Sequence, residues 1–133
     1  MSAINYQEAT GPIDEATLLS LGALAGQVFV VPGQAVPSAG DFAEQLNVAV
    51  NGHQWVHLVL ASIDGTLVGF KVGRSNDPRM FESWVGGVHP DARRRGIASQ
   101  LAAMQEAWCR AHGFQFIQTE TAHDNQAMLT VNL

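Results

Sequence analysis

The chain has 133 residues, of which 47% are hydrophobic and 14% charged, and its formal net charge is −5 at pH 7. This length holds one domain with a core of its own, and the composition excludes a disordered segment or a coiled coil. The negative charge argues against a nucleic-acid surface, and no apolar run approaches the roughly 20 residues that span a bilayer. The single cysteine, Cys109, cannot form an internal disulfide, so we expect a cytoplasmic protein. From the charge and the short apolar runs, we expect it to bind neither nucleic acid nor membrane.

The N-terminal half predicts a strand, two helices and a β-hairpin. Apolar residues first recur at helical spacing, and near residue 55 the pattern changes to β-branched, strand-like runs. The dipeptide Asp64-Gly65 joins two such runs and is a strong hairpin signal, because both positions of the turn need positive φ. The predicted elements are a strand at 3–8, helices at 14–30 and from about 38, and strands at 55–63 and 66–73.

The C-terminal half predicts a strand, a long helix, another strand and the start of a last helix. After a turn at residues 76–78, the strands are expected at 80–88 and 114–120, and the long helix opens near Gly96. A strand, a helix and a strand in this order form a βαβ crossover with parallel strands. The last helix is expected to begin at Asp124 or Asn125. The fold class is therefore mixed α/β (α+β): a mainly antiparallel sheet flanked by helices, with one βαβ crossover.

Three of the seven basic residues are consecutive, at Arg93, Arg94 and Arg95. They lie between a predicted strand and a predicted helix, where free amides and the helix dipole favour an anion such as pyrophosphate. Gly96 allows the backbone to approach a ligand closely. The segment is neither a Walker loop nor a three-glycine dinucleotide fingerprint. The alternative is a solvated run of charge at the start of a helix.

The six residues Arg93-Arg94-Arg95-Gly96-Ile97-Ala98 match the pattern Gln/Arg-x-x-Gly-x-Gly/Ala, with Val88-His89-Pro90 before them. In this context the chain resembles the GNAT superfamily of N-acetyltransferases, most clearly in its second half. The resemblance implies one GNAT domain over residues 1–133, acetyl-CoA as cosubstrate, no metal, and direct transfer of the acetyl group to a primary amine in a ternary complex. The acceptor is not indicated.

The resemblance also implies a set of cofactor-binding residues. Amides of residues 94–99 would hold the pyrophosphate, and residues 86–88 would pair with the pantetheine arm like an added strand. The pair Gly86-Gly87 suits a bulge and a close ligand approach, or alternatively tight packing under a helix. The full set is Gly86, Gly87, Val88, Arg93, Arg94, Arg95, Gly96, Ile97, Ala98, Ser99 and Asn125.

For the general base, the resemblance points to Glu82. Strand alternation places it on the same face as Trp84, Gly86 and Val88; the alternative is a solvent-facing charge. The tyrosine that serves as general acid in the family is replaced by Asn132, and the only tyrosine is Tyr6. Cys109, beside the apolar stripe of its helix, is expected to be a buried structural thiol.

At the C-terminus, family members continue into a Gly-Phe turn and a strand pair, so the domain is expected to be incomplete relative to the family. This would leave the edge of strand 114–120 open and favour a homodimer through it. Two other functions are open: a degenerate CoA-binding or sensory module without turnover, and an unrelated phosphate-binding α/β domain.

Overall fold

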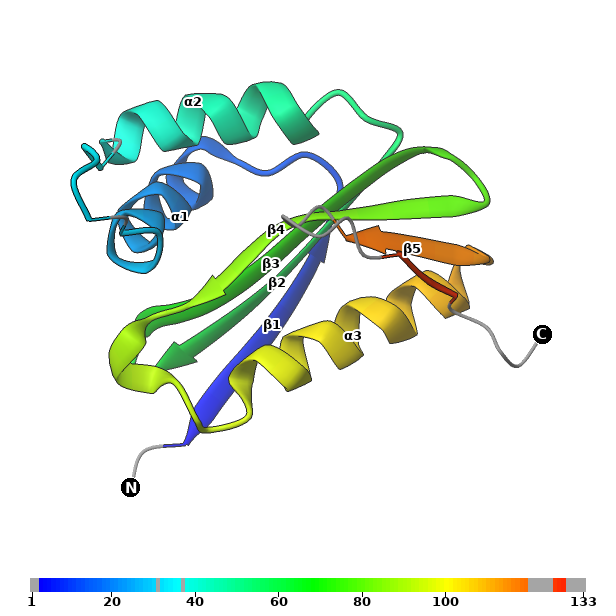
Figure 1. The fold of residues 1–133 in the computed structure, drawn as a ribbon. Helices are drawn as coiled ribbons and strands as arrows, with labels where there is room; N and C mark the ends of the chain where they lie inside the picture. The colour runs from blue at the N-terminus through cyan, green and yellow to red at the C-terminus, as the bar shows by residue number, and fades with distance from the viewer. Residues whose placement is uncertain (1–2, 31, 37, 120–125, 129–133) are drawn as a thin grey trace.

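A computed structural model describes residues 3–30, 32–36, 38–119 and 126–128. Within them the chain forms a six-stranded sheet in the order β1-β2-β3-β4-β5-β6, with α1 and α2 on one face and α3 on the other (Figure 1). The elements are β1 Ile4–Thr10, α1 Glu15–Val28, α2 Ala39–Val50, β2 Trp55–Ile63, β3 Thr66–Asp77, β4 Met80–Val88, a 3-10 helix Pro90–Ala92, α3 Ile97–Ala111, β5 Phe116–Thr119 and β6 Gln126–Met128. The predicted mixed α/β class is confirmed.

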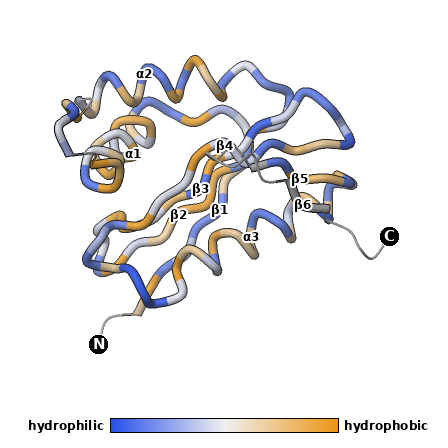
Figure 2. Tube along the Cα trace, in the orientation of Figure 1, coloured by the Kyte–Doolittle hydropathy of each residue, from blue (hydrophilic) through white to orange (hydrophobic). Residues whose placement is uncertain are grey.

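The core lies on both faces of the sheet. Leu21 of α1, Leu46 of α2 and Phe70 of β3 are buried together on one face, while Val59 of β2 and Leu101 of α3 are buried on the other. Strands covered on both faces are apolar along their length, and Figure 2 shows such apolar stretches along the strands and polar ones at the turns. None of the helices in the described residues is long and apolar enough to cross a membrane.

Local signals set the helix starts and the hairpin. The carboxylate of Asp14 accepts the Thr17 N–H at 2.7 Å and so caps α1. Hydrogen bonds from the side chain of Thr17 and from its backbone N–H lower the pKa of Asp14. Ser38 caps α2 in the same way. Asp64 and Gly65 have φ angles of 52° and 79°, which confirms the turn predicted between β2 and β3.

The βαβ crossover is confirmed. β4 and β5 are parallel and pair from Met80↔Phe116 to Ser83↔Thr119, with α3 between them in the chain. The pairing ends at Ser83, so no described strand lies along the outer edge of residues 84–88. β3 extends to Asp77, beyond its predicted end at residue 73, because β4 pairs with it as far as Asp77↔Met80.

The C-terminal part differs from the prediction. Residues 126–128 form β6, antiparallel to β5, rather than the first turn of a helix. The physical reason is the unpaired backbone of β5, whose edge accepts these residues as a further strand. The prediction that this edge is open is therefore wrong at residues 116–118, and the homodimer predicted through it loses its basis.

Candidate cofactor cleft and active site

A β-bulge at Trp84 interrupts β4. Val72 pairs with Val85 and Gly73 with Ser83, so Trp84 is an extra residue with no partner on β3. The bulge had been predicted at Gly86-Gly87, and that position is wrong, since both glycines pair regularly with β3. The extra residue reverses the alternation of side chains beyond it.

This reversal changes the surroundings of Glu82. Glu82 pairs with Arg74 and so shares a face with Val85, which packs in the α1–α2 core. Val88 packs against α3 on the opposite face, and Gly86 belongs to that face by its pairing with Lys71. The prediction that Glu82 shares a face with Gly86 and Val88 is wrong, because strand alternation assumed no bulge between them.

The two glycines of β4 are required by close contacts. A Cβ on Gly87 would lie 2.5 Å from Cγ1 of Val28 in α1, and a Cβ on Gly86 would lie 2.9 Å from the carbonyl oxygen of Phe70. Tight packing, one of the two interpretations offered for this pair, is therefore present.

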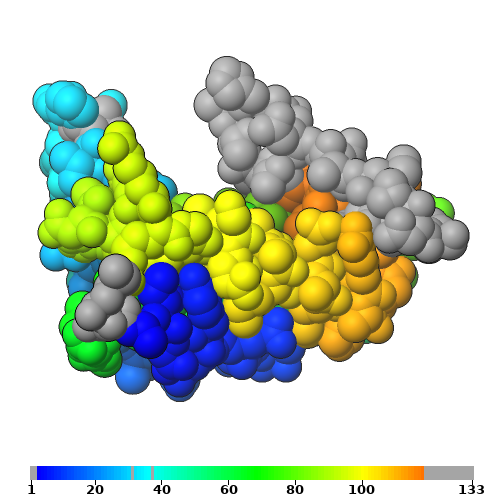
Figure 3. Space-filling model, turned by 90° about the horizontal axis from the view of Figure 1, so that it is seen from below, coloured from blue at the N-terminus to red at the C-terminus, as the bar shows by residue number. Residues whose placement is uncertain are grey.

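A cleft of about 650 Å³ runs along this edge. One end lies at residues 93–96, here called the arginine loop, and the other end at Ser83. Figure 3 views the molecule from the α3 side and shows a hollow above α3 beside the yellow-green residues that lead into α3. The cleft brings together every predicted cofactor residue in the described part except Arg95: Gly86, Gly87, Val88, Arg93, Arg94, Gly96, Ile97, Ala98 and Ser99. Asn125 lies outside the described residues.

The first turn of α3, directly after the arginine loop, has backbone amides without an intrahelical partner at the end of the cleft. Gly96 is the N-cap of α3, with φ of 76° and no side-chain cap, and the first helical hydrogen bond is from Gln100 N–H to its carbonyl. Arg94 is also left-handed, with φ of 67°, a conformation that non-glycine residues adopt at a cost. Nε of Arg93 donates to the Val88 carbonyl at 3.2 Å, which ties the loop to the end of β4. The N-terminus of α3 and two guanidinium groups thus make one end of the cleft electropositive.

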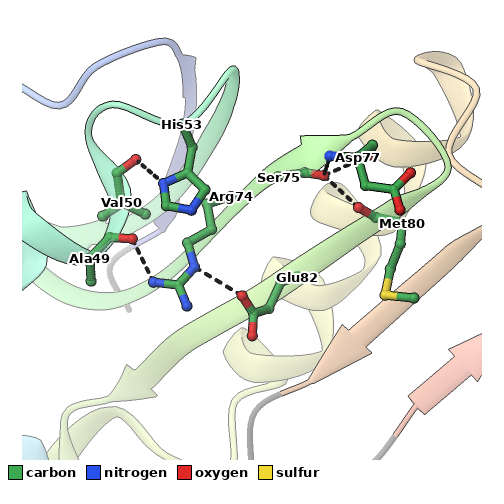
Figure 4. A network of polar contacts seen from close by, with 8 residues as sticks. All are labelled: Ala49, Val50, His53, Arg74, Ser75, Asp77, Met80 and Glu82. Atoms are coloured by element: carbon green, nitrogen blue, oxygen red, sulfur yellow. Dashed lines mark hydrogen bonds and ion pairs between the residues drawn. The ribbon is translucent and has the colours of Figure 1, made fainter.

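Glu82 lies beside the cleft and does not line it. Its Oε1 accepts a hydrogen bond from Nε of Arg74 at 2.9 Å, and Arg74 also donates to the Ala49 carbonyl of α2 (Figure 4). The guanidinium carbon lies 5.1 Å from the ring centroid of Trp84. The bulge residue, the arginine and the glutamate therefore form one unit between β4 and α2.

Two cleft residues escaped the sequence analysis. Lys71 of β3 and Ser83 of β4 both line the cleft. Burial lowers the pKa of Lys71. A single cation within the apolar run Val68–Val72 was the available signal for Lys71, whereas an isolated serine gave none for Ser83.

Other polar side chains of interest lie outside the cleft. Burial raises the pKa of the Cys109 thiol to about 12, as expected of a structural cysteine. His57 is fully buried, its Nε2 lies 2.8 Å from Oε2 of Glu8, and its ring stacks on Trp108. Among the described residues, no group of three or more His, Cys, Asp and Glu side chains could hold a metal ion.

Comparison with known proteins identifies relatives of this fold. The aminoglycoside N-acetyltransferase AAC(6')-Iy in complex with CoA has a TM-score of 0.66 at 18% identity, over 92% of this chain and 79% of that one. The ribosomal-protein-S18-alanine N-acetyltransferase from Escherichia coli has a TM-score of 0.66 at 10% identity, over 86% and 67%. Diaminobutyrate acetyltransferase EctA from Paenibacillus lautus, in complex with L-2,4-diaminobutyric acid and coenzyme A, has a TM-score of 0.62 at 19% identity, over 91% and 67%.

At these identities the solved structures establish the fold alone, and a search of curated proteins finds no significant match. The family follows from a separate comparison: the model of the acetyltransferase (GNAT) family matches residues 31–131, which is well over half of the chain. The chain therefore belongs to the GNAT family of acetyltransferases.

Proposed function

We propose that this protein transfers an acetyl group from acetyl-CoA to a primary amine, by direct attack within a ternary complex. One observation carries the proposal: the 650 Å³ cleft joins the N-terminus of α3 to the edge of β4 that no described strand covers. The first end suits a pyrophosphate, which the amides of residues 97–99 and the guanidinium groups of Arg93 and Arg94 would hold. The second end suits an extended chain that hydrogen-bonds to the strand edge.

The dimensions of the open edge support this placement. From Ser83 to Val88, five residue steps of about 3.3 Å give roughly 17 Å of strand, somewhat less where the bulge shortens it. This length is comparable to that of an extended phosphopantetheine arm. With its pyrophosphate at the arginine loop, such an arm would bring the thioester close to Trp84 and Ser83. Backbone N–H groups near the bulge would then be available to polarise the thioester carbonyl.

A second pocket supports a site for the acceptor. It has a volume of about 300 Å³ and adjoins the cleft through two shared residues, Phe29 and Val85. Its remaining lining is Ala25, Gly26, Phe42 and Gln45, so it is almost entirely apolar. We infer that the acceptor carries its amine on an apolar or aromatic group.

Glu82 is the proposed general base. It shares a face with Val85, which lines both cavities, and it lies outside the cleft, so the proton of the attacking amine would reach its carboxylate through an intervening water. The ion pair with Arg74 would hold the carboxylate in place during this transfer.

The experiment is a binding titration followed by a turnover assay. We expect CoA and acetyl-CoA to raise the melting temperature, because a ligand that binds only the folded state stabilises it. Release of free thiol is then measured with a panel of amines that compares phenylethylamine-like acceptors with polycationic aminoglycosides. We expect release with the apolar amines, and absence of CoA binding would refute the proposal.

A second candidate, CoA binding without turnover, is favoured by one observation. The carboxylate of Glu82 is engaged by Arg74 and does not line the cleft. CoA binding with no thiol release on any amine of the panel would support this second function.

A further inference from the structure

Ser83 carries a buried hydroxyl with no hydrogen-bond partner. The residue is 3% exposed, and its Oγ is one of two buried side-chain atoms in the described residues that lack a partner. A buried polar group left unpaired costs about 1–3 kcal/mol, so it calls for an explanation. Ser83 lines the cleft at the last residue pair between β4 and β5. A polar ligand atom at this end of the cleft would satisfy the hydroxyl.

Lys71 is the only lysine of the chain and is directed to the same cleft. It lies opposite Gly86, and its Cγ would be 3.3 Å from a Cβ built on that glycine. Both Lys71 and Gly86 line the cleft, so a ligand in the cleft can reach the lysine. Burial lowers the pKa of its ammonium group. Within the part of the chain that the structure describes, the other charged residues that line the cleft are Arg93 and Arg94 at its opposite end.

Lys71 and Ser83 project from the same face of the sheet. Ser83 pairs with Gly73, two residues after Lys71 on β3, so the lysine and the serine are diagonal neighbours across two strands. Such positions are about 7–8 Å apart at their Cα atoms, within reach of a lysine side chain. The only tyrosine, Tyr6, is on β1, which β2 and β3 separate from β4.

We propose that Lys71 and Ser83 form the acid site for the sulfur of coenzyme A, in place of a tyrosine; this inference rests on the proposed function. As the amine nitrogen bonds to the carbonyl carbon and the C–S bond breaks, the electron pair passes to sulfur. The Lys71 ammonium gives its proton to the thiolate, and the Ser83 hydroxyl donates a hydrogen bond to the same sulfur. The proton lost from the amine nitrogen later restores the ammonium. Amine and thioester thus become amide and thiol with no other reactant.

The test measures the bound thiol directly and needs no acceptor. CoA is titrated with base while bound to the protein, thiolate is followed by its ultraviolet absorbance, and the desulfo-CoA complex is subtracted. A thiol ordinarily has a pKa of about 8.5, and an ammonium beside it favours the thiolate. We expect bound CoA to be roughly tenfold or more acidic than free CoA, a shift of about one pH unit.

Two variants of Lys71 separate charge from proton donation. Lys71→Met fills the same space without charge and is expected to abolish the shift in thiol acidity. Lys71→Arg is expected to keep the shift, because the charge remains, but to lower kcat by roughly 10²-fold or more, because arginine does not release its proton. Ser83→Ala is expected to reduce the shift without abolishing it. The melting shift with CoA shows that each variant is folded and binds.

The outcomes distinguish this inference from the proposed function. If wild-type protein does not bind CoA, the proposed function fails and the melting experiment reveals it first. If CoA binds but its thiol titrates as it does in free solution, the acid site is refuted while the cofactor site stands. An unchanged thiol titration in Lys71→Met would refute it equally, and the wild-type titration decides the matter even if that variant does not fold.

Discussion

Replacing Gly96 by valine tests the arginine loop at the point where backbone and cofactor are proposed to meet. A Cβ at this position has no protein atom within 4 Å, so the new side chain does not clash within the folded chain. It must, however, adopt the left-handed φ of 76°, which costs roughly 1–2 kcal/mol for a residue with a side chain. For a domain of 133 residues this corresponds to a drop in melting temperature of roughly 4–7 °C.

Gly113→Val is the matched control. Gly113 has φ of 84°, also has no atom within 4 Å of a built Cβ, and follows the opposite end of the same helix, α3. It does not line the cleft, so its substitution introduces similar backbone strain without touching the proposed site. Both variants should therefore melt earlier than the wild type by similar amounts.

The assay is the melting shift with CoA, followed by calorimetry. At a concentration of 100 Kd, ligand binding stabilises the folded state by about 2.7 kcal/mol. We expect this stabilisation in the wild type and in Gly113→Val, and its loss in Gly96→Val. Equal CoA binding by both variants would refute the assignment of the arginine loop. Loss of binding in both would mean that strain in α3, and not the contact at Gly96, controls the site.

Three further predictions concern Glu82, His57 and Cys109. Glu82→Gln should lower kcat by roughly 10²-fold and flatten the acid limb of the pH–rate profile, with the CoA melting shift unchanged; an unchanged profile would leave Glu82 only a structural role beside Arg74. Burial lowers the pKa of His57, although Glu8 opposes the effect, so below about pH 6.5 the unfolded chain takes up a proton that the folded chain resists. The contribution of His57 to stability is therefore present above that pH and lost below it. Urea midpoints at pH 7.5 and 5.5 should show this loss, and His57→Gln should reduce it; an equal loss in the variant would contradict the assignment. Cys109, whose pKa burial raises to about 12, should resist thiol reagents at pH 8 until denaturant unfolds the chain, and rapid labelling of the native protein would contradict its burial.

Local chemistry determined several features from the sequence alone. Asp64-Gly65 predicts the β2–β3 hairpin because its turn depends on two residues, and the apolar stripe of α3 follows from its helical period. The order of strand, helix and strand predicts the parallel pairing of β4 with β5. The residues of the arginine loop are adjacent in the chain, so their place at the start of a helix could be predicted and, with it, the family.

Only the tertiary structure decided features that depend on how strands pair. The bulge at Trp84 arises from the way β4 pairs with β3, and it places Glu82 on the face opposite that of Val88. Lys71 and Ser83 lie twelve positions apart in the sequence and meet in one cleft because β3 pairs with β4. The pairing of β6 with β5 and the contact between His57 and Glu8 also join segments that are distant in the sequence. A shift of one residue in register reverses every side chain that follows it, and the free energy that selects the register comes from packing across the whole sheet. No short stretch of sequence contains that information.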